Sequence, residues 1–201
     1  MRIQIVLFDG FDELDALAPY EVLRRAEEMG AEMQTDLVTL APTEEIAGFY
    51  HLRVRPDGRL GEPERPDVLI VPGGGWNHRG PRGARHETEI GELPAALRRL
   101  HDDGTILAAV CTGAMLLARA GLLVGRPATT HHVALEELRA EGAELVEARV
   151  VDDGDVITAG GVTSGHDLAL WLVERFSGPR LAAAVERRME YERRGTVWRR
   201  A

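Results

Sequence analysis

The 201-residue sequence contains no lysine, and all 24 of its basic residues are arginine. This absence excludes chemistry that needs a lysine amine, such as Schiff-base formation or the phosphate-binding lysine of a P-loop. The basic residues are outnumbered by 33 acidic ones, which gives a formal net charge of −9. Because nucleic-acid binding needs a basic face that neutralises phosphates, we expect no nucleic-acid partner.

Long apolar stretches and cysteines are scarce as well. No apolar run approaches the roughly 20 residues of a membrane-spanning helix, and the N-terminal run is too short for a secretory signal, so we expect no membrane partner and a cytoplasmic location. The one cysteine, Cys111, cannot form a disulfide within the chain, which suits a reducing compartment. No residue spacing resembles a metal site, and we expect neither a metal nor another cofactor.

Short apolar runs alternate with amphipathic stretches, which is the pattern of a parallel sheet covered by helices on both faces. We therefore predict one three-layer α/β domain over residues 1–201 with a mainly parallel sheet. Strands are expected at IQIVLF, TDLVTL, DVLIVP and TILAAV, and further helices at 14–29, 90–100, 133–141, 167–176 and 181–191.

Turn and cap signals add detail to this prediction. Residues 51–60 and 148–160 each carry an Asp-Gly turn between apolar arms, and both are predicted to form β-hairpins at the edge of the sheet. Ser164 and Asp167 have the spacing of a capping box at the start of the helix that follows them.

The end of the DVLIVP strand leads into Gly73, Gly74 and Gly75. In an open α/β sheet, ligands bind where strands lead into helices. Glycines let the backbone approach a ligand closely and direct N–H groups at negative charge. A tight turn is the simpler explanation of such a glycine run.

Cys111 lies where the strand TILAAV gives way to a helix that begins near Thr112. A thiol near a helix N-terminus is expected to have a pKa below its usual value of roughly 8.5, which favours the nucleophilic thiolate. Gly113 leaves room for a sharp bend. The alternative is a small buried core residue, because free cysteine is among the most buried residue types.

Acidic residues crowd the end of the first strand, and most of them are expected only to satisfy free N–H groups at the helix start. Asp15 differs because it has apolar neighbours, Leu14 and Leu17, and we predict that its side chain points inward. His131 and His132 are candidates for a base that serves the thiol, or are ordinary core histidines.

These segments together resemble the ThiJ/PfpI family of class I glutamine-amidotransferase-like proteins over nearly the whole chain. The resemblance is carried by LDALAP, VLIVPGGG, AAVCTGAMLLARAGLLVGRPATTHH and VITAGGVTSGHDLAL. It implies a flavodoxin-like sandwich, with Cys111 on a nucleophile elbow and an acid from the first strand–helix segment. It also implies a homodimer.

Two positions suggest a branch of this family. Thr112 follows the cysteine where protease-like and chaperone-like members have histidine, and Asp15 stands where deglycase-like members have glutamate. The combination is similar to isocyanide hydratases and to the sensing domains of AraC-type transcription regulators. Trp76, His78 and His166 depart from the hydratase pattern and leave the substrate open.

The resemblance implies a cofactor-free enzyme that hydrates a small carbon–nitrogen substrate, specifically an isocyanide to an N-formamide. Cys111 would attack the carbon and Asp15 would transfer protons. The charge would be stabilised, and the substrate contacted, by Gly74, Gly75, Thr112 and His131. The alternatives are a non-catalytic ligand- or redox-sensing dimer, and a glyoxalase or deglycase that acts on reactive aldehydes.

Overall fold

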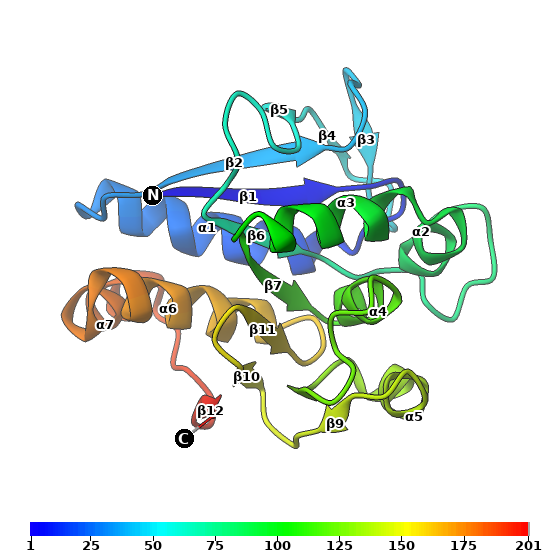
Figure 1. Ribbon diagram of the computed structural model, residues 1–201. Helices are drawn as coiled ribbons and strands as arrows, with labels where there is room; N and C mark the ends of the chain where they lie inside the picture. The colour runs from blue at the N-terminus through cyan, green and yellow to red at the C-terminus, as the bar shows by residue number, and fades with distance from the viewer. Residues whose placement is uncertain (201) are drawn as a thin grey trace.

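The computed structural model describes residues 1–200, and an eight-stranded sheet forms its centre (Figure 1). The strand order is β12-β10-β11-β7-β6-β1-β2-β5, and β10 and β12 run opposite to the others. The strands are β1 (Arg2–Leu7), β2 (Gln34–Thr39), β5 (Gly58–Arg59), β6 (Val68–Val71), β7 (Ile106–Val110), β10 (Val150–Asp152), β11 (Val156–Ala159) and β12 (Trp198–Arg199). Two small ladders join β3 (Ile46–Ala47) to β4 (Arg53–Val54) and β8 (Pro127–Ala128) to β9 (Glu144–Leu145).

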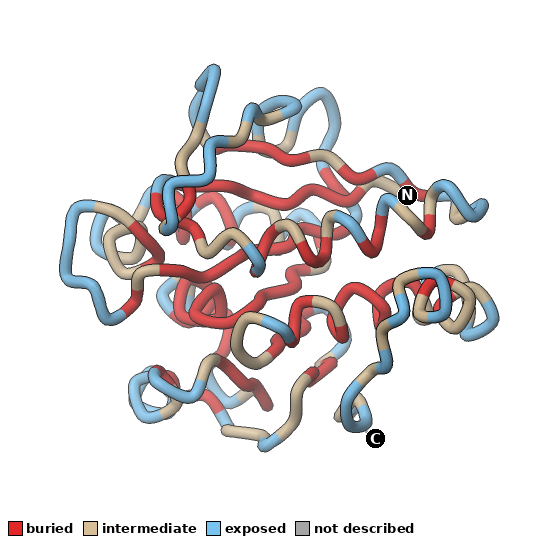
Figure 2. Tube along the Cα trace, turned by 180° about the vertical axis from the view of Figure 1, so that it is seen from behind, coloured by how far each residue is buried: buried red, intermediate tan, exposed pale blue. Residues whose placement is uncertain are grey.

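Helices cover both faces of the sheet (Figures 1 and 2). One layer packs α1 (Glu13–Glu28), α6 (Ser164–Ser177) and α7 (Pro179–Met189) against each other. The other holds α2 (Ala84–Ile90), α3 (Glu92–Asp102), α4 (Gly113–Arg119) and α5 (Leu135–Ala140), which follows the short 3-10 helix η1 (His132–Ala134). The prediction of a three-layer α/β domain with a mainly parallel sheet is confirmed.

The central strands are buried along almost their whole length (Figure 2). β6 (VLIV) and β7 (ILAAV) are apolar at every position because helices cover both faces of this parallel sheet and exclude water from both sides. This is why the sequence placed these strands within one or two residues. No helix within residues 1–200 is long and apolar enough to cross a membrane.

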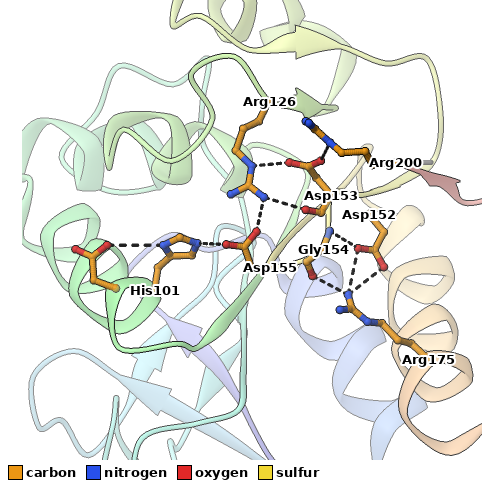
Figure 3. Close-up of polar contacts among 9 residues, drawn as sticks. His101, Arg126, Asp152, Asp153, Gly154, Asp155, Arg175 and Arg200 are labelled. Atoms are coloured by element: carbon orange, nitrogen blue, oxygen red, sulfur yellow. Dashed lines mark hydrogen bonds and ion pairs between the residues drawn. The ribbon is translucent and has the colours of Figure 1, made fainter.

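The predicted hairpin at 148–160 is confirmed, since β10 and β11 pair antiparallel with Val150 opposite Ala159. A charged network surrounds its turn (Figure 3). Arg126 binds Asp153 and Asp155, and Asp155 also contacts His101 at 2.8 Å. On the other side of the turn, Arg175 binds Asp152 (Figure 3).

The predicted hairpin at 51–60 is wrong. β4 pairs antiparallel with β3, whereas β5 pairs parallel with β2 at the sheet edge. Asp57 explains the difference, because its N–H donates to the Leu37 carbonyl at 2.7 Å and its carboxylate accepts the Leu37 N–H at 2.8 Å. The Asp-Gly pair therefore joins the chain to β2 instead of turning it back on itself.

Two helix predictions also need correction. The helix predicted at 90–100 is α3, which begins only at Glu92 because Gly91 adopts φ 82° and separates it from α2, a helix that the sequence did not predict. The capping box is absent: Asp167 accepts hydrogen bonds from Arg149 Nε at 2.7 Å and from the Arg194 N–H at 3.0 Å. Its carboxylate thus holds the C-terminal segment instead of the start of α6.

Candidate active site

The strand order places a topological switch point between β1 and β6, because the chain continues to β2 on one side and to β7 on the other. Ligand sites of open α/β sheets lie at such points, beyond the carboxyl ends of the strands. The loop after β1 carries Asp15, the loop after β6 carries the glycine run, and the loop after β7 carries Cys111. The structure therefore brings the three predicted segments to one place.

Cys111 occupies a sharp bend between β7 and α4. Its φ is 57°, in the left-handed region that a non-glycine residue rarely adopts. Its N–H donates to the carbonyls of Ala159 at 3.1 Å and Gly160 at 2.9 Å, and Thr130 Oγ1 donates to its carbonyl at 2.8 Å. Strain held by surrounding hydrogen bonds at a strand-to-helix turn is the geometry of a nucleophile elbow.

Two glycines make this bend sterically feasible. A Cβ at Gly113 would lie 2.2 Å from the Val71 carbonyl oxygen, and a Cβ at Gly73 would lie 2.4 Å from Thr112 Oγ1. The β6 and β7 loops thus pack backbone against backbone. Gly113 is required for this close approach, as the sequence suggested.

Asp15 lies on α1 with no solvent exposure, so the prediction that it points inward is confirmed. Its Oδ2 accepts the Gly73 N–H at 3.0 Å, while Oδ1 is buried without a hydrogen-bond partner. Burial, and secondarily the charge of Asp12, raise the pKa of Asp15 well above its usual value, and the Cys111 thiol lies close enough to affect its ionisation. A buried carboxyl with one free oxygen is suited to donate a proton.

The expected low pKa of Cys111 is wrong. The side chain is only 6% exposed, and burial raises the pKa of its thiol above the usual value. The negative charge of Asp15 raises it further, although backbone N–H groups of Val162 and Thr112 favour the thiolate. The ionisations of the thiol and the Asp15 carboxyl are therefore coupled, because both anions together are unfavourable in a buried site.

The glycine loop does not present all of its N–H groups to the thiol. The Gly74 N–H donates to Thr112 Oγ1 at 3.1 Å, so in this structure it holds the elbow and is not free for a ligand. Gly75 follows at φ 64°. The Thr112 hydroxyl therefore links the β6 and β7 loops, while its N–H faces the sulfur.

His131 is the N-cap of η1, and its Nδ1 accepts the Val133 N–H at 3.2 Å. That bond assigns the proton of the neutral ring to Nε2. Burial lowers the pKa of His131, and the adjacent His132, whose ring centroid is 4.2 Å away, adds to the effect. The ring lies against Gly161, where a Cβ would meet it at 2.2 Å. His131 is thus a neutral donor beside the elbow.

The three residues that departed from the hydratase pattern make other contacts. Trp76 is buried, and its Nε1 donates to Glu137 at 3.0 Å. His78 packs edge-on against Phe49, and His166 stacks on Tyr191. None of these contacts involves Cys111 or Asp15.

Sequence reasoning missed Val162 as a neighbour of the thiol. It has φ 40°, which is strained for a β-branched residue, and its N–H faces Cys111. The glycine pair before it, Gly160 and Gly161, was the available signal. Within residues 1–200 no cluster of three or more His, Cys, Asp or Glu residues is arranged to hold a metal.

Comparison with known proteins gives a consistent result. The sequence model of the DJ-1/PfpI family matches residues 1–175. An isonitrile hydratase of Pseudomonas putida is 33% identical over 193 residues, which cover 95% of this chain and 78% of that protein. Deglycase TK1284 of Thermococcus kodakarensis is 31% identical over 87% of this chain and 96% of its own length. The crystal structure of a ThiJ/PfpI family protein from Pseudomonas syringae superimposes with a TM-score of 0.81 at 26% identity, covering 96% of this chain and 76% of that one.

Proposed function

Because the chain belongs to the DJ-1/PfpI family, we propose that it is a cysteine-dependent hydratase or hydrolase of a small carbon–nitrogen substrate, most specifically an isocyanide hydratase. The family contains enzymes of more than one activity, among them the isonitrile hydratase and the deglycase similar to this chain. The observation that carries the proposal is the buried pair of Asp15 and Cys111, which offers a nucleophile and an acid without a histidine.

The proposed reaction adds one water to the isocyanide. In the reactive state Asp15 is protonated and Cys111 is the thiolate. The thiolate attacks the terminal carbon, so a C–S bond forms and the Asp15 proton passes to that carbon. The product of this step is a thioimidate. The Asp15 carboxylate then takes a proton from a water molecule while the water oxygen bonds to the carbon. Asp15 passes this proton on to the substrate nitrogen. Loss of the thiolate releases the N-formamide, and the remaining hydroxyl proton returns to Asp15.

Neighbouring groups would stabilise the charges in this sequence. The N–H groups of Thr112 and Val162 face the sulfur and favour the leaving thiolate. We propose that Gly75 and His131 contact the substrate nitrogen and its substituent. Gly74 would act indirectly, because its N–H donates to Thr112 Oγ1 and holds that residue in place. A free thiol nucleophile works in a reducing compartment, and we propose the cytoplasm as its location.

The test is incubation of the pure protein with several isocyanides, methylglyoxal and hydrogen peroxide, followed by mass spectrometry of products and protein. We expect N-formamides to accumulate over many turnovers. Conversion of methylglyoxal alone would replace the proposal with the deglycase alternative. Oxidation of Cys111 by a single equivalent of peroxide, without turnover of any substrate, would replace it with the sensing alternative.

We also propose that the chain is a homodimer. Large apolar side chains are exposed beside the start of α1, where the Glu13 carboxylate accepts the N–H groups of Tyr50 and Leu52. Tyr50 is 74% exposed and Leu52 45%, and Leu14 lies on the same helix as Glu13. Exposed apolar groups that gather in one place are typical of an association surface.

Sedimentation should therefore report about twice the 22.1 kDa of one chain. Tyr50→Arg should shift the protein toward monomer, because it places a charge on the apolar surface. Val124→Arg is the matched control, since Val124 is 68% exposed in a different loop and should leave the dimer intact. A parent protein that sediments as a monomer at micromolar concentration would contradict the proposal.

A further inference from the structure

A cavity of about 1220 Å³ adjoins the nucleophile elbow. Three of its lining residues also contact Cys111. The Thr130 hydroxyl donates to the Cys111 carbonyl, the Gly160 carbonyl accepts the Cys111 N–H, and the Val162 N–H faces the thiol. The cavity therefore adjoins the elbow through these three residues, of which Val162 is the one that faces the thiol, while Cys111 and Asp15 do not line it.

The C-terminal segment Gly195–Arg199 also lines this cavity and is called here its C-terminal wall. Figure 1 shows this segment, which includes β12, beside β10, where Trp198 pairs with Val151. The segment is fixed before and after the cavity. On one side the Arg194 N–H donates to Asp167, and on the other Arg200 binds Asp153 at 2.5 Å (Figure 3).

This wall lies beyond residue 175, where the match to the family model ends. The residues around the thiol belong to the matched part, whereas the C-terminal wall is formed by residues beyond it.

The size and lining of the cavity indicate what it accepts. Pockets of roughly 300–1,000 Å³ enclose drug-sized ligands, so a methyl-sized substrate would leave most of this space empty. Apolar side chains of Leu135, Leu145 and Val197 line it. Of its charged lining residues, Arg139 pairs with Glu136 and Arg149 with the buried Asp167, while Glu147 and Arg199 carry opposite charges, so no sign of charge dominates. An uncharged, bulky group fits this lining better than an ion does.

We propose that Gly195–Arg199 forms the specificity-determining wall of a pocket for the substrate's substituent, which makes the protein selective for isocyanides with a bulky apolar group. The identity of the reacting group, an isocyanide, rests on the proposed function, whereas the pocket for its substituent does not. Thr196 is the residue to vary, because it lines the cavity, is exposed, and makes no side-chain hydrogen bond within residues 1–200.

Thr196→Trp should fill the pocket. We expect kcat/KM for benzyl isocyanide to fall by roughly tenfold or more, while kcat/KM for methyl isocyanide changes by less than about twofold. Glu192→Trp is the matched control, since it adds the same side chain to an exposed residue of the C-terminal segment that does not line this cavity and makes no side-chain hydrogen bond within residues 1–200, and it should change neither value. An equal fall in kcat/KM for both isocyanides, or no change for either, would contradict the proposed role of the wall in substrate selection.

A second variant tests the wall without introducing a large side chain that could disturb the local fold at Thr196. Deletion of 195–201 removes the wall, and it should reduce the preference for benzyl over methyl isocyanide, again by roughly tenfold. A deletion that leaves this preference as in the parent would count against the proposal.

Alkylation of Cys111 separates the pocket from the proposed reaction. Because Cys111 is the only cysteine, one adduct reports its reactivity. We expect Thr196→Trp to slow alkylation by N-benzyl iodoacetamide and to spare alkylation by iodoacetamide. If this selectivity appears while the parent hydrates no isocyanide, the proposed function fails and the wall stands. If the parent hydrates isocyanides but neither assay depends on substituent size in the variants, the wall fails and the function stands.

Discussion

Asp15→Asn is expected to lower isocyanide turnover by roughly 10²-fold or more while leaving Cys111 reactive. The amide keeps the shape of the carboxyl and can hold the Gly73 N–H, but it has no acidic proton to transfer. Removing the carboxylate charge also lowers the pKa of Cys111, because that charge is one of the causes that raise it. Alkylation by iodoacetamide at pH 7 should therefore be at least as fast as in the parent protein.

Asp9→Asn is the matched control for this variant. Asp9 precedes α1 in the same acidic segment, but its side chain is exposed, so turnover should stay at the parent level. Parent-like turnover in Asp15→Asn would show that Asp15 is only a helix-start carboxylate. Loss of alkylation together with turnover would indicate a displaced elbow instead of a missing acid.

The same substitution should change how stability depends on pH. Burial raises the folded-state pKa of Asp15, so folding favours its protonated form. The stability that this proton provides is fully present below the unfolded pKa of roughly 4 and is lost as pH rises through the folded pKa. Thermal unfolding of parent and Asp15→Asn, compared from acid to alkaline pH, should show the variant gaining stability relative to the parent as pH rises.

Gly113→Ala should destabilise the protein by about 1–3 kcal/mol or more and displace Cys111. The new Cβ would lie 2.2 Å from the Val71 carbonyl oxygen and 2.9 Å from that of Pro72, and neither backbone atom can move without disturbing β6. Because α4 begins at Gly113, the strain would reach the thiol directly. Urea unfolding gives the loss of stability, and iodoacetamide alkylation reports the displaced cysteine.

Gly80→Ala serves as the control, since a Cβ there meets nothing within 4 Å and φ lies outside the left-handed region. Its unfolding free energy should stay within about 0.5 kcal/mol of the parent value. If Gly113→Ala were equally mild, the close approach of the β6 and β7 loops would not constrain the elbow.

Those parts of the candidate site that depend on the sequence pattern of a single segment could be predicted from the sequence. β6 and β7 are buried on both faces, so their apolar runs mark the strand ends at which the glycine loop and Cys111 lie. Asp15 was identifiable because its sequence neighbours are apolar and α1 packs on the sheet.

The features that were missed depend on contacts between segments far apart in the chain. The lowered pKa expected for Cys111 took account of the helix but not of Asp15, which is 96 positions away in sequence and reaches the thiol only through the fold. The bond from the Gly74 N–H to Thr112 and the approach of Val162 have the same origin. β12 is two residues long and polar on one side, so no periodicity marks it as a strand.

The two outermost strands of the sheet limit how copies of the chain can assemble. β5 and β12 are each two residues long, and Arg59 and Arg199 are exposed on them. Short, charged edge strands offer few free backbone groups to an incoming strand and protect against uncontrolled fibre-like stacking. We therefore expect the proposed dimer to form through helices and loops, so that the sheet of one subunit does not continue into the sheet of the other.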